Sequence, residues 1–246
     1  MTKIEDLAKI IKESKRIVFF GGAGVSTESG IKDYRSKDGL YNTVKQYGVS
    51  PEEILSKHFF EENPEIFYDF YRSYFITSAE PNAAHYALAR LEREGKLSAV
   101  ITQNIDGLHQ SAGSRNVIEL HGTTSVFFCH SCKASADASE TNKTIASGGI
   151  PRCPKCGGVI RPKVVMYEEP LYPGTTERAV EAISGADTLI IGGTSLAVYP
   201  ANSFIRFFGG DNLVIINKTE TKFDSVANLI MRSKIGETFE RVMELI

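Results

Sequence analysis

Residues 16–36 read RIVFFGGAGVSTESGIKDYRS, an apolar run at 16–20 that leads directly into a glycine-rich loop at 21–36. This order is typical of a buried strand followed by a phosphate-binding turn. Gly22 and Gly24 open the dinucleotide fingerprint, but Thr27 stands where its third glycine belongs. The half-fingerprint alone would also suit a loop that merely turns the chain, so the surrounding sequence has to decide.

Three further segments, 98–103, 187–193 and 212–217, have the character of buried strands, because they are short and rich in valine and isoleucine. Amphipathic helical patterns occupy 82–95 and 236–246. Strands that alternate with helices predict an α/β fold, a doubly wound and mostly parallel sheet covered on both faces. Ligands of such sheets bind at the carboxyl ends of the strands.

The composition is that of an ordinary globular protein, with 42% hydrophobic and 24% charged residues and a formal net charge of -2. This charge provides no strong field for nucleic acid or an anionic membrane. The N-terminal segment places Ile4, Leu7, Ile10 and Ile11 on one helical face, which indicates an amphipathic helix rather than a signal peptide. No apolar run approaches the roughly 20 residues that span a bilayer. We therefore expect a cytoplasmic protein, whose oligomeric state the sequence leaves open.

Two intervals interrupt the βαβ rhythm and are interpreted as insertions. The first, 40–75, is helical in pattern and rich in aromatic residues that we expect to form a core: Phe59, Phe60, Phe67, Phe70, Tyr71 and Tyr74. The second, 122–160, contains all the cysteines. Within it, 133–149 is small and polar, which predicts a mobile loop.

The four cysteines form two C-x-x-C pairs, Cys129 with Cys132 and Cys153 with Cys156, separated by twenty residues. Two such pairs can supply four thiolates to one zinc ion and close its tetrahedral shell, so the predicted site is structural. Two disulfides are the alternative, which the lack of a secretory signal argues against. His130 lies inside the first pair but is not needed as a ligand. A zinc ribbon could also bind nucleic acid, yet the near-neutral charge and the absence of interleaved basic and aromatic residues argue against that role.

Polar residues follow the second strand, where Gln103, Asn104 and Asp106 come at the position in which an α/β sheet presents groups to its ligand. Shortly afterwards, an apolar run ends in His121. A histidine that emerges from such a run is well suited to act as a general base near neutral pH. We interpret three of the other histidines as structural, namely His58, His85 and His109. His130 is expected to have no role as a ligand.

Taken together, these motifs resemble those of the sirtuin family of NAD-dependent protein-lysine deacylases. The matching segments, in order, are GAGVSTESGIKDYR at 22–35, TQNIDGLHQSAG at 102–113, LHG at 120–122, the two cysteine pairs, GGTSLAVYP at 192–200 and VIIN at 214–217. The resemblance covers the chain from Gly21 onward and implies a Rossmann-like domain with a small domain made of a zinc-ribbon module and a helical module. We assign 1–35, 76–125 and 160–246 to the Rossmann-like, NAD-binding domain. We assign 36–75 and 126–159 to the small domain, with NAD in the cleft between the two.

The resemblance also implies individual roles. The glycine-rich loop would hold the pyrophosphate, residues 103–106 the nicotinamide ribose and the nicotinamide, and the late motifs the adenosine half. The implied cofactor-binding residues are Gly22, Ala23, Gly24, Thr27, Asp33, Tyr34, Arg35, Gln103, Asn104, Ile105, Asp106, His121, Gly193, Thr194, Ser195, Asn217, Lys218 and Ile235. His121, the general base, and Asn104 would be the catalytic residues.

In the chemistry that the resemblance implies, NAD is a consumed cosubstrate. The carbonyl oxygen of an acylated lysine in a protein substrate attacks the ribose carbon that bears nicotinamide, and His121 then activates a ribose hydroxyl. That hydroxyl oxygen attacks the imidate, and after hydrolysis by water the products are nicotinamide, free lysine and O-acyl-ADP-ribose. Two alternatives stay open: mono-ADP-ribosyl transfer, which begins from the same activated ribose, and an NAD- and zinc-binding module without turnover.

Substrate contacts are implied for the segment VVMYEE at 164–169, through Val165, Met166, Tyr167 and Glu168. Glu168 stands where the family usually has glycine, and its charge predicts a preference for basic residues flanking the acylated lysine. Family members that remove acidic acyl groups carry a tyrosine and an arginine three residues apart. Arg72 could match that arginine, but Asp69 precedes it, which favours acetyl or longer uncharged acyl groups. Two more departures are Lys32 in place of proline and Tyr34 in place of phenylalanine.

Overall fold

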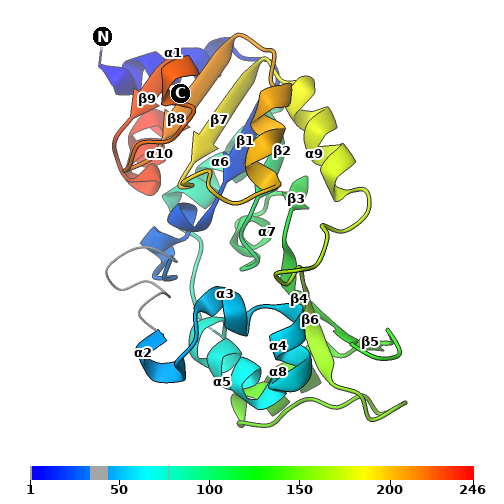
Figure 1. Ribbon diagram of the computed structural model, residues 1–246. Helices are drawn as coiled ribbons and strands as arrows, with labels where there is room; N and C mark the ends of the chain where they lie inside the picture. Colours follow the sequence, from blue (N-terminus) through cyan, green and yellow to red (C-terminus); the bar gives the residue numbers. More distant parts are fainter. Residues whose placement is uncertain (1, 34–43, 77) are drawn as a thin grey trace.

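The larger part of the protein is a six-stranded parallel sheet (Figure 1), seen in a computed structural model that describes residues 2–33, 44–76 and 78–246. The strand order is β3-β2-β1-β7-β8-β9. The strands are β1 (Ile17–Gly21), β2 (Leu97–Thr102), β3 (Val117–Glu119), β7 (Thr188–Gly192), β8 (Asn212–Ile216) and β9 (Leu229–Met231). The four strands expected from the sequence are β1, β2, β7 and β8, so the doubly wound α/β prediction is confirmed.

The two strands that were not expected, β3 and β9, form the edges of the sheet. Each contains only three residues, of which one is buried. A strand this short and this exposed has neither the length nor the continuous apolar character that marks the four inner strands.

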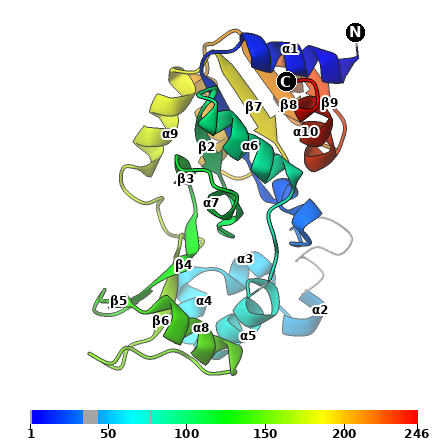
Figure 2. The same ribbon diagram turned by 180° about the vertical axis from the view of Figure 1, so that it is seen from behind.

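Helices cover both faces of the sheet (Figures 1 and 2). α1 (Lys3–Glu13), α6 (Ala83–Arg93) and α10 (Ile235–Met243) share one core cluster with Phe19 of β1. α9 (Thr175–Ser184) and the 3-10 segment η4 (Ala201–Phe207) share the other cluster with Phe20. Successive side chains of a strand point to opposite faces, so burial on both faces accounts for the uninterrupted apolar runs in the sequence.

The small module lies beyond the carboxyl ends of the parallel strands (Figure 1). Its antiparallel sheet has the order β5-β4-β6, with β4 (Gly122–Cys129), β5 (Ser135–Ala136) and β6 (Ile160–Val164). Its helices are α2 (Val44–Tyr47), α3 (Pro51–Ile54), α4 (Lys57–Glu62), α5 (Pro64–Tyr74) and α8 (Ala138–Ala146). β6 pairs with β4 here, although the sequence interpretation grouped residues from 160 onward with the large domain.

The expected mobile loop at 133–149 is wrong, because this segment forms β5 and the helix α8. Asp137 caps the helix by accepting a hydrogen bond from the Glu140 N–H. Thr141 and Ile145, one helical turn apart, are buried. These are the only two fully buried positions of α8, so the small polar residues around them concealed the amphipathic pattern.

The aromatic insertion forms a core, as expected. Phe60, Phe67 and Tyr71 pack in one buried cluster with Phe127 of β4, while Phe59 and Phe70 belong to a neighbouring cluster. Within the described ranges, no helix has the length and apolar character needed to cross a bilayer.

Candidate functional site

The sheet reverses its direction of winding between β1 and β7, which are adjacent although β2 follows β1 on the other side. The loops that leave these two strands touch each other: the Gly24 N–H donates a hydrogen bond to the Gly193 carbonyl at 2.8 Å. A Cβ on Gly24 would lie only 2.8 Å from the Gly193 Cα, and Gly193 itself has a φ of +58°. Glycine is therefore required here for the two loops to approach each other, in addition to any approach to phosphate.

A cavity of about 1100 Å³ opens at this switch point and extends to the small module. The predicted cofactor residues that line it are Gly22, Ala23, Gly24, Thr27, Asp33, Gln103, Asn104, Ile105, Asp106, His121, Gly193, Thr194, Ser195, Asn217, Lys218 and Ile235. The predicted substrate residues Val165, Met166, Tyr167 and Glu168 line the same cavity. Tyr34 and Arg35 lie outside the described residues. The geometry brings the candidates together, and the binding role of each one stays a prediction.

A hydrogen-bonded group at the base of the cavity joins the end of β2 to the glycine-rich loop. The Ser26 hydroxyl donates to the Asp106 carboxylate at 2.7 Å and accepts from the Asn104 side-chain amide at 3.0 Å. The other Asp106 oxygen accepts from the Leu108 N–H at 3.0 Å. Ser26 was not singled out from the sequence, although it lies inside the quoted loop motif. Its contacts orient both Asn104 and Asp106.

His121 lies in the turn between β3 and β4, and its Nδ1 is 2.9 Å from the Gln103 carbonyl oxygen. A carbonyl can only accept, so Nδ1 carries the proton and Nε2 of the neutral ring is left as a proton acceptor. Burial lowers the pKa of His121, and the bond to Gln103 opposes that shift. The ring is thus held in the neutral form that a general base requires.

The backbone of His121 is tied to the candidate substrate segment, because the Val165 N–H donates to the His121 carbonyl at 2.8 Å. The neighbouring Gly122 has a φ of +76°, and a Cβ there would lie 2.1 Å from the Lys163 carbonyl oxygen. Only glycine allows β4 to begin so close to β6. The proton acceptor and the segment 164–169 therefore have a fixed spacing.

Arg161, which is 1% exposed, makes hydrogen bonds to both ends of the segment 164–169. The guanidinium donates to both Glu169 carboxylate oxygens, each at 2.8 Å, and to the Val164 carbonyl. Glu169 also accepts from the Met166 N–H at 3.0 Å. Burial opposes the ionisation of Glu169, but the bonds from Arg161 and Met166 outweigh it and lower the pKa. The sequence interpretation assigned no role to Arg161, since a fully buried arginine has no signature in the pattern around it.

The helical module contacts the same segment from the side. The Tyr167 N–H donates to the Leu55 carbonyl at 3.0 Å, and the Lys57 N–H donates to the Tyr167 carbonyl at 3.1 Å. Glu168, the next residue, has a φ of +76°, which explains why glycine is usual there. For a residue with a Cβ this left-handed backbone costs about 1–2 kcal/mol.

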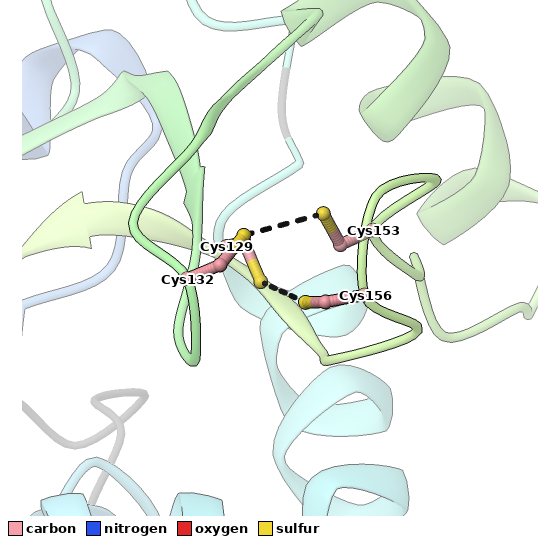
Figure 3. A group of neighbouring side chains, drawn as sticks. All are labelled: Cys129, Cys132, Cys153 and Cys156. Carbon is pink, nitrogen blue, oxygen red and sulfur yellow. Dashed lines mark hydrogen bonds between the residues drawn. The ribbon is translucent and has the colours of Figure 1, made fainter.

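The four cysteine side chains converge at the far end of β4 (Figure 3). The Sγ atoms of Cys129 and Cys156 are 3.5 Å apart, and those of Cys132 and Cys153 are 3.7 Å apart. All four ligand atoms lie within 4.8 Å of one another and none is disulfide-bonded. A tetrahedral ion with bonds of about 2.3 Å would separate its sulfurs by roughly 3.8 Å. The cluster therefore fits one structural zinc ion, and the disulfide alternative is wrong.

The remaining histidines divide between the core and the surface. His85 and His109 are fully buried with ring centroids 4.7 Å apart, which confirms their structural interpretation. Burial lowers the pKa of His85 to about 4 and that of His109 to about 3. His130 pairs with Glu61 at 2.9 Å and stays outside the cysteine group. His58 is on the surface of α4, between two carboxylates.

Arg72 does not line the described part of the cavity. Its guanidinium pairs with Asp69 at 2.6 Å and donates to the Ile145 carbonyl in α8. The position of Arg72 therefore does not support its match to an acyl-carboxylate ligand.

The fold and the cavity define a class: doubly wound nucleotide-binding α/β proteins with a cysteine-held module across the ligand cleft. The sequence profile of the Sir2 family matches residues 22–200. An NAD-dependent protein deacetylase of Clostridium acetobutylicum is 51% identical over 244 residues, which cover 99% of each chain.

Two solved structures share the whole fold. A Sir2 complex with a p53 peptide and NAD+ has a TM-score of 0.88 at 37% identity, covering 99% of this chain and 98% of the other. A Sir2 complex with a deacetylated p53 peptide and 3'-O-acetyl ADP ribose has a TM-score of 0.90 at 38% identity and the same coverage. The chain belongs to the Sir2 family, the sirtuins.

Proposed function

We propose that this protein is an NAD-dependent protein-lysine deacylase, which consumes NAD, an acylated lysine and water and releases nicotinamide, free lysine and O-acyl-ADP-ribose. The observation that carries the proposal is the single cavity that joins the glycine-rich loop, His121 and the segment 164–169. Deacetylase relatives of the same length and Sir2 complexes with NAD, peptide and acetyl ADP ribose support it.

In the proposed reaction, NAD occupies the cavity as a substrate and is cleaved at its nicotinamide–ribose bond. Asp106 and Asn104, both oriented by Ser26, would bind the nicotinamide end and its ribose. His121, with Nδ1 committed to the Gln103 carbonyl, would accept a ribose hydroxyl proton at Nε2. The fixed spacing between His121 and Val165 would place the acyl group beside the proton acceptor.

The proposed acyl group is acetyl or a longer uncharged chain. Arg72 is paired with Asp69 outside the cavity lining, so it offers no partner to an acyl carboxylate. Glu52 and Glu168 line the cavity beside the substrate segment, and we propose that their carboxylates favour basic residues in the peptide. We propose a cytoplasmic location, because zinc thiolates suit a reducing compartment. The domain division 1–35, 76–125 and 160–246 against 36–75 and 126–159 also stays a proposal.

Incubation with NAD and an acetyl-lysine peptide, followed by mass spectrometry, tests the function. Peptide-dependent release of nicotinamide together with a peptide that has lost its acetyl group would support deacylation. A peptide that gains the mass of ADP-ribose would indicate transfer instead. If neither product forms although NAD binds, the result would indicate a binding module without turnover.

A further inference from the structure

The residue Glu168 has an unfavourable backbone conformation, and its side chain makes contacts that glycine could not make. The turn 166–169 is closed by a hydrogen bond from the Glu169 N–H to the Met166 carbonyl at 3.0 Å, and Glu168 is its third residue, with a φ of +76°. Turns with a positive φ at this position favour glycine. The side chain of Glu168 therefore has to compensate for its backbone.

That side chain reaches the helical module. One carboxylate oxygen of Glu168 lies 2.7 Å from Nδ1 of His58, and the other accepts the His58 backbone N–H at 3.2 Å. The two residues are 110 positions apart in the chain. They lie beside the backbone pairing of Tyr167 with Leu55 and Lys57. The side-chain contact therefore adds to the backbone hydrogen bonds that join the substrate segment to the helical module.

The His58 ring faces carboxylates on both sides. Its Nε2 lies 2.9 Å from a Glu53 oxygen of α3, while its Nδ1 faces Glu168. A carboxylate only accepts, and a neutral imidazole has one N–H, so both contacts exist together only in the doubly protonated ring. Both carboxylates raise the pKa of His58. Lys57, on the same helix, is a positive charge that also acts on Glu168.

We propose that Glu168 and His58 form a latch that positions the substrate segment against the helical module, and that the latch is complete only while His58 is doubly protonated. Both are positioning residues for the acylated peptide. The inference rests on the proposed deacylase function. Peptide affinity would be highest at the acidic end of the working range and would fall as the pH rises and His58 loses a proton.

The test is the dissociation constant of a fluorescent acetyl-lysine peptide with uncharged flanks, measured by anisotropy without NAD between pH 6 and 9. The absence of NAD excludes turnover and therefore the titration of chemical steps. For the wild type, we expect the dissociation constant to rise about two- to fivefold across the titration of His58, as suits an exposed ion pair. In Glu168→Gln the affinity should be weak and independent of pH. NMR of the ring should show a lower His58 pKa in that variant.

Two matched variants sharpen the test. Glu62→Gln removes a charge from the same helix, where Glu62 is exposed, and should keep the wild-type pH profile. Glu168→Gly restores the favourable turn residue and should still bind peptide weakly, because the side chain is what closes the latch. An unchanged pH profile in Glu168→Gln, or wild-type affinity in Glu168→Gly at low pH, would overturn the inference. If the wild type neither binds the peptide nor releases nicotinamide with NAD, the proposed function fails instead.

Discussion

Replacement of Arg161 by methionine should destabilise the protein and loosen its substrate segment. Arg161 is buried and gives two hydrogen bonds at 2.8 Å to Glu169. Methionine keeps much of the packing against Phe60 and Phe128 but leaves Glu169 without its partner. Removing one member of a buried ion pair costs about 3–5 kcal/mol. Because the Glu169 side chain is 22% exposed, water can reach it, and we expect about 3 kcal/mol.

Urea denaturation followed by circular dichroism, in the presence of zinc, measures this cost. For a chain of this length, a loss of about 3 kcal/mol corresponds to a melting temperature roughly 6–12 °C lower. The double variant Arg161→Met/Glu169→Leu removes both charges and should recover stability to within about 1 kcal/mol of the wild type. It should still show a raised peptide KM, because the Met166 N–H has lost its acceptor.

A single variant Arg161→Met within about 0.5 kcal/mol of the wild type would refute this reasoning, since a partly buried carboxylate that has lost its charged partner should destabilise the protein by more than that. So would a double variant as unstable as the single one, which would indicate that the packing of Arg161 matters rather than its charge. The coupling energy from the complete cycle separates these two contributions.

Four other predictions follow from the site and the core. His121→Ala should lower kcat by about 10²–10⁴-fold, as measured by peptide deacetylation; equal turnover would exclude it as the base. Chelation of zinc should unfold the small module, observed as a loss of amide protection in β4 and α8; unchanged protection would contradict a structural ion. The pKa values of His85 and His109 lie below 6.5, at about 4 and about 3, so the unfolded chain binds more protons than the folded one in mild acid. The contribution of the two neutral histidines to the free energy of unfolding should be fully present above pH 6.5 and should fall by about 2 kcal/mol per histidine on going to pH 5. In His109→Asn the urea midpoint should therefore depend less on pH. Peptides with basic residues beside the acylated lysine should have a higher kcat/KM than peptides with acidic residues there. Equal values would contradict a role for the carboxylates that line the cavity.

The inner strands, the cysteine group and the polar residues at the strand ends could be predicted, because each has a local signature. Continuous apolar runs mark β1, β2, β7 and β8, and two C-x-x-C pairs mark the thiolate site. The helix α8 was missed because only Thr141 and Ile145 are fully buried in it. The short edge strands were missed because each buries a single residue.

The parts of the site that could not be predicted depend on contacts between residues far apart in the sequence. Ser26 orients Asn104 from 78 positions away, and His58 meets Glu168 across 110 positions. Neither pairing has a period or a spacing that a sequence pattern could reveal. The departure of Glu168 from glycine could be recognised in the sequence, but its reason became visible only with the position of His58.

The pairing of β4 with β6 has a consequence for protein engineering. Gly122 pairs with Val164 at one end of this ladder, and Cys129 pairs with Ile160 at the other. The chain between the two strands leaves the ladder and returns at the cysteine group, so its length does not determine the spacing of His121 and Val165. The segment 138–149 can therefore accept an added group without a change in that spacing, but Thr141 and Ile145 have to stay, because both are buried and Ile145 belongs to the aromatic core cluster. The exposed side of α8 is the natural insertion point for a tether or a label.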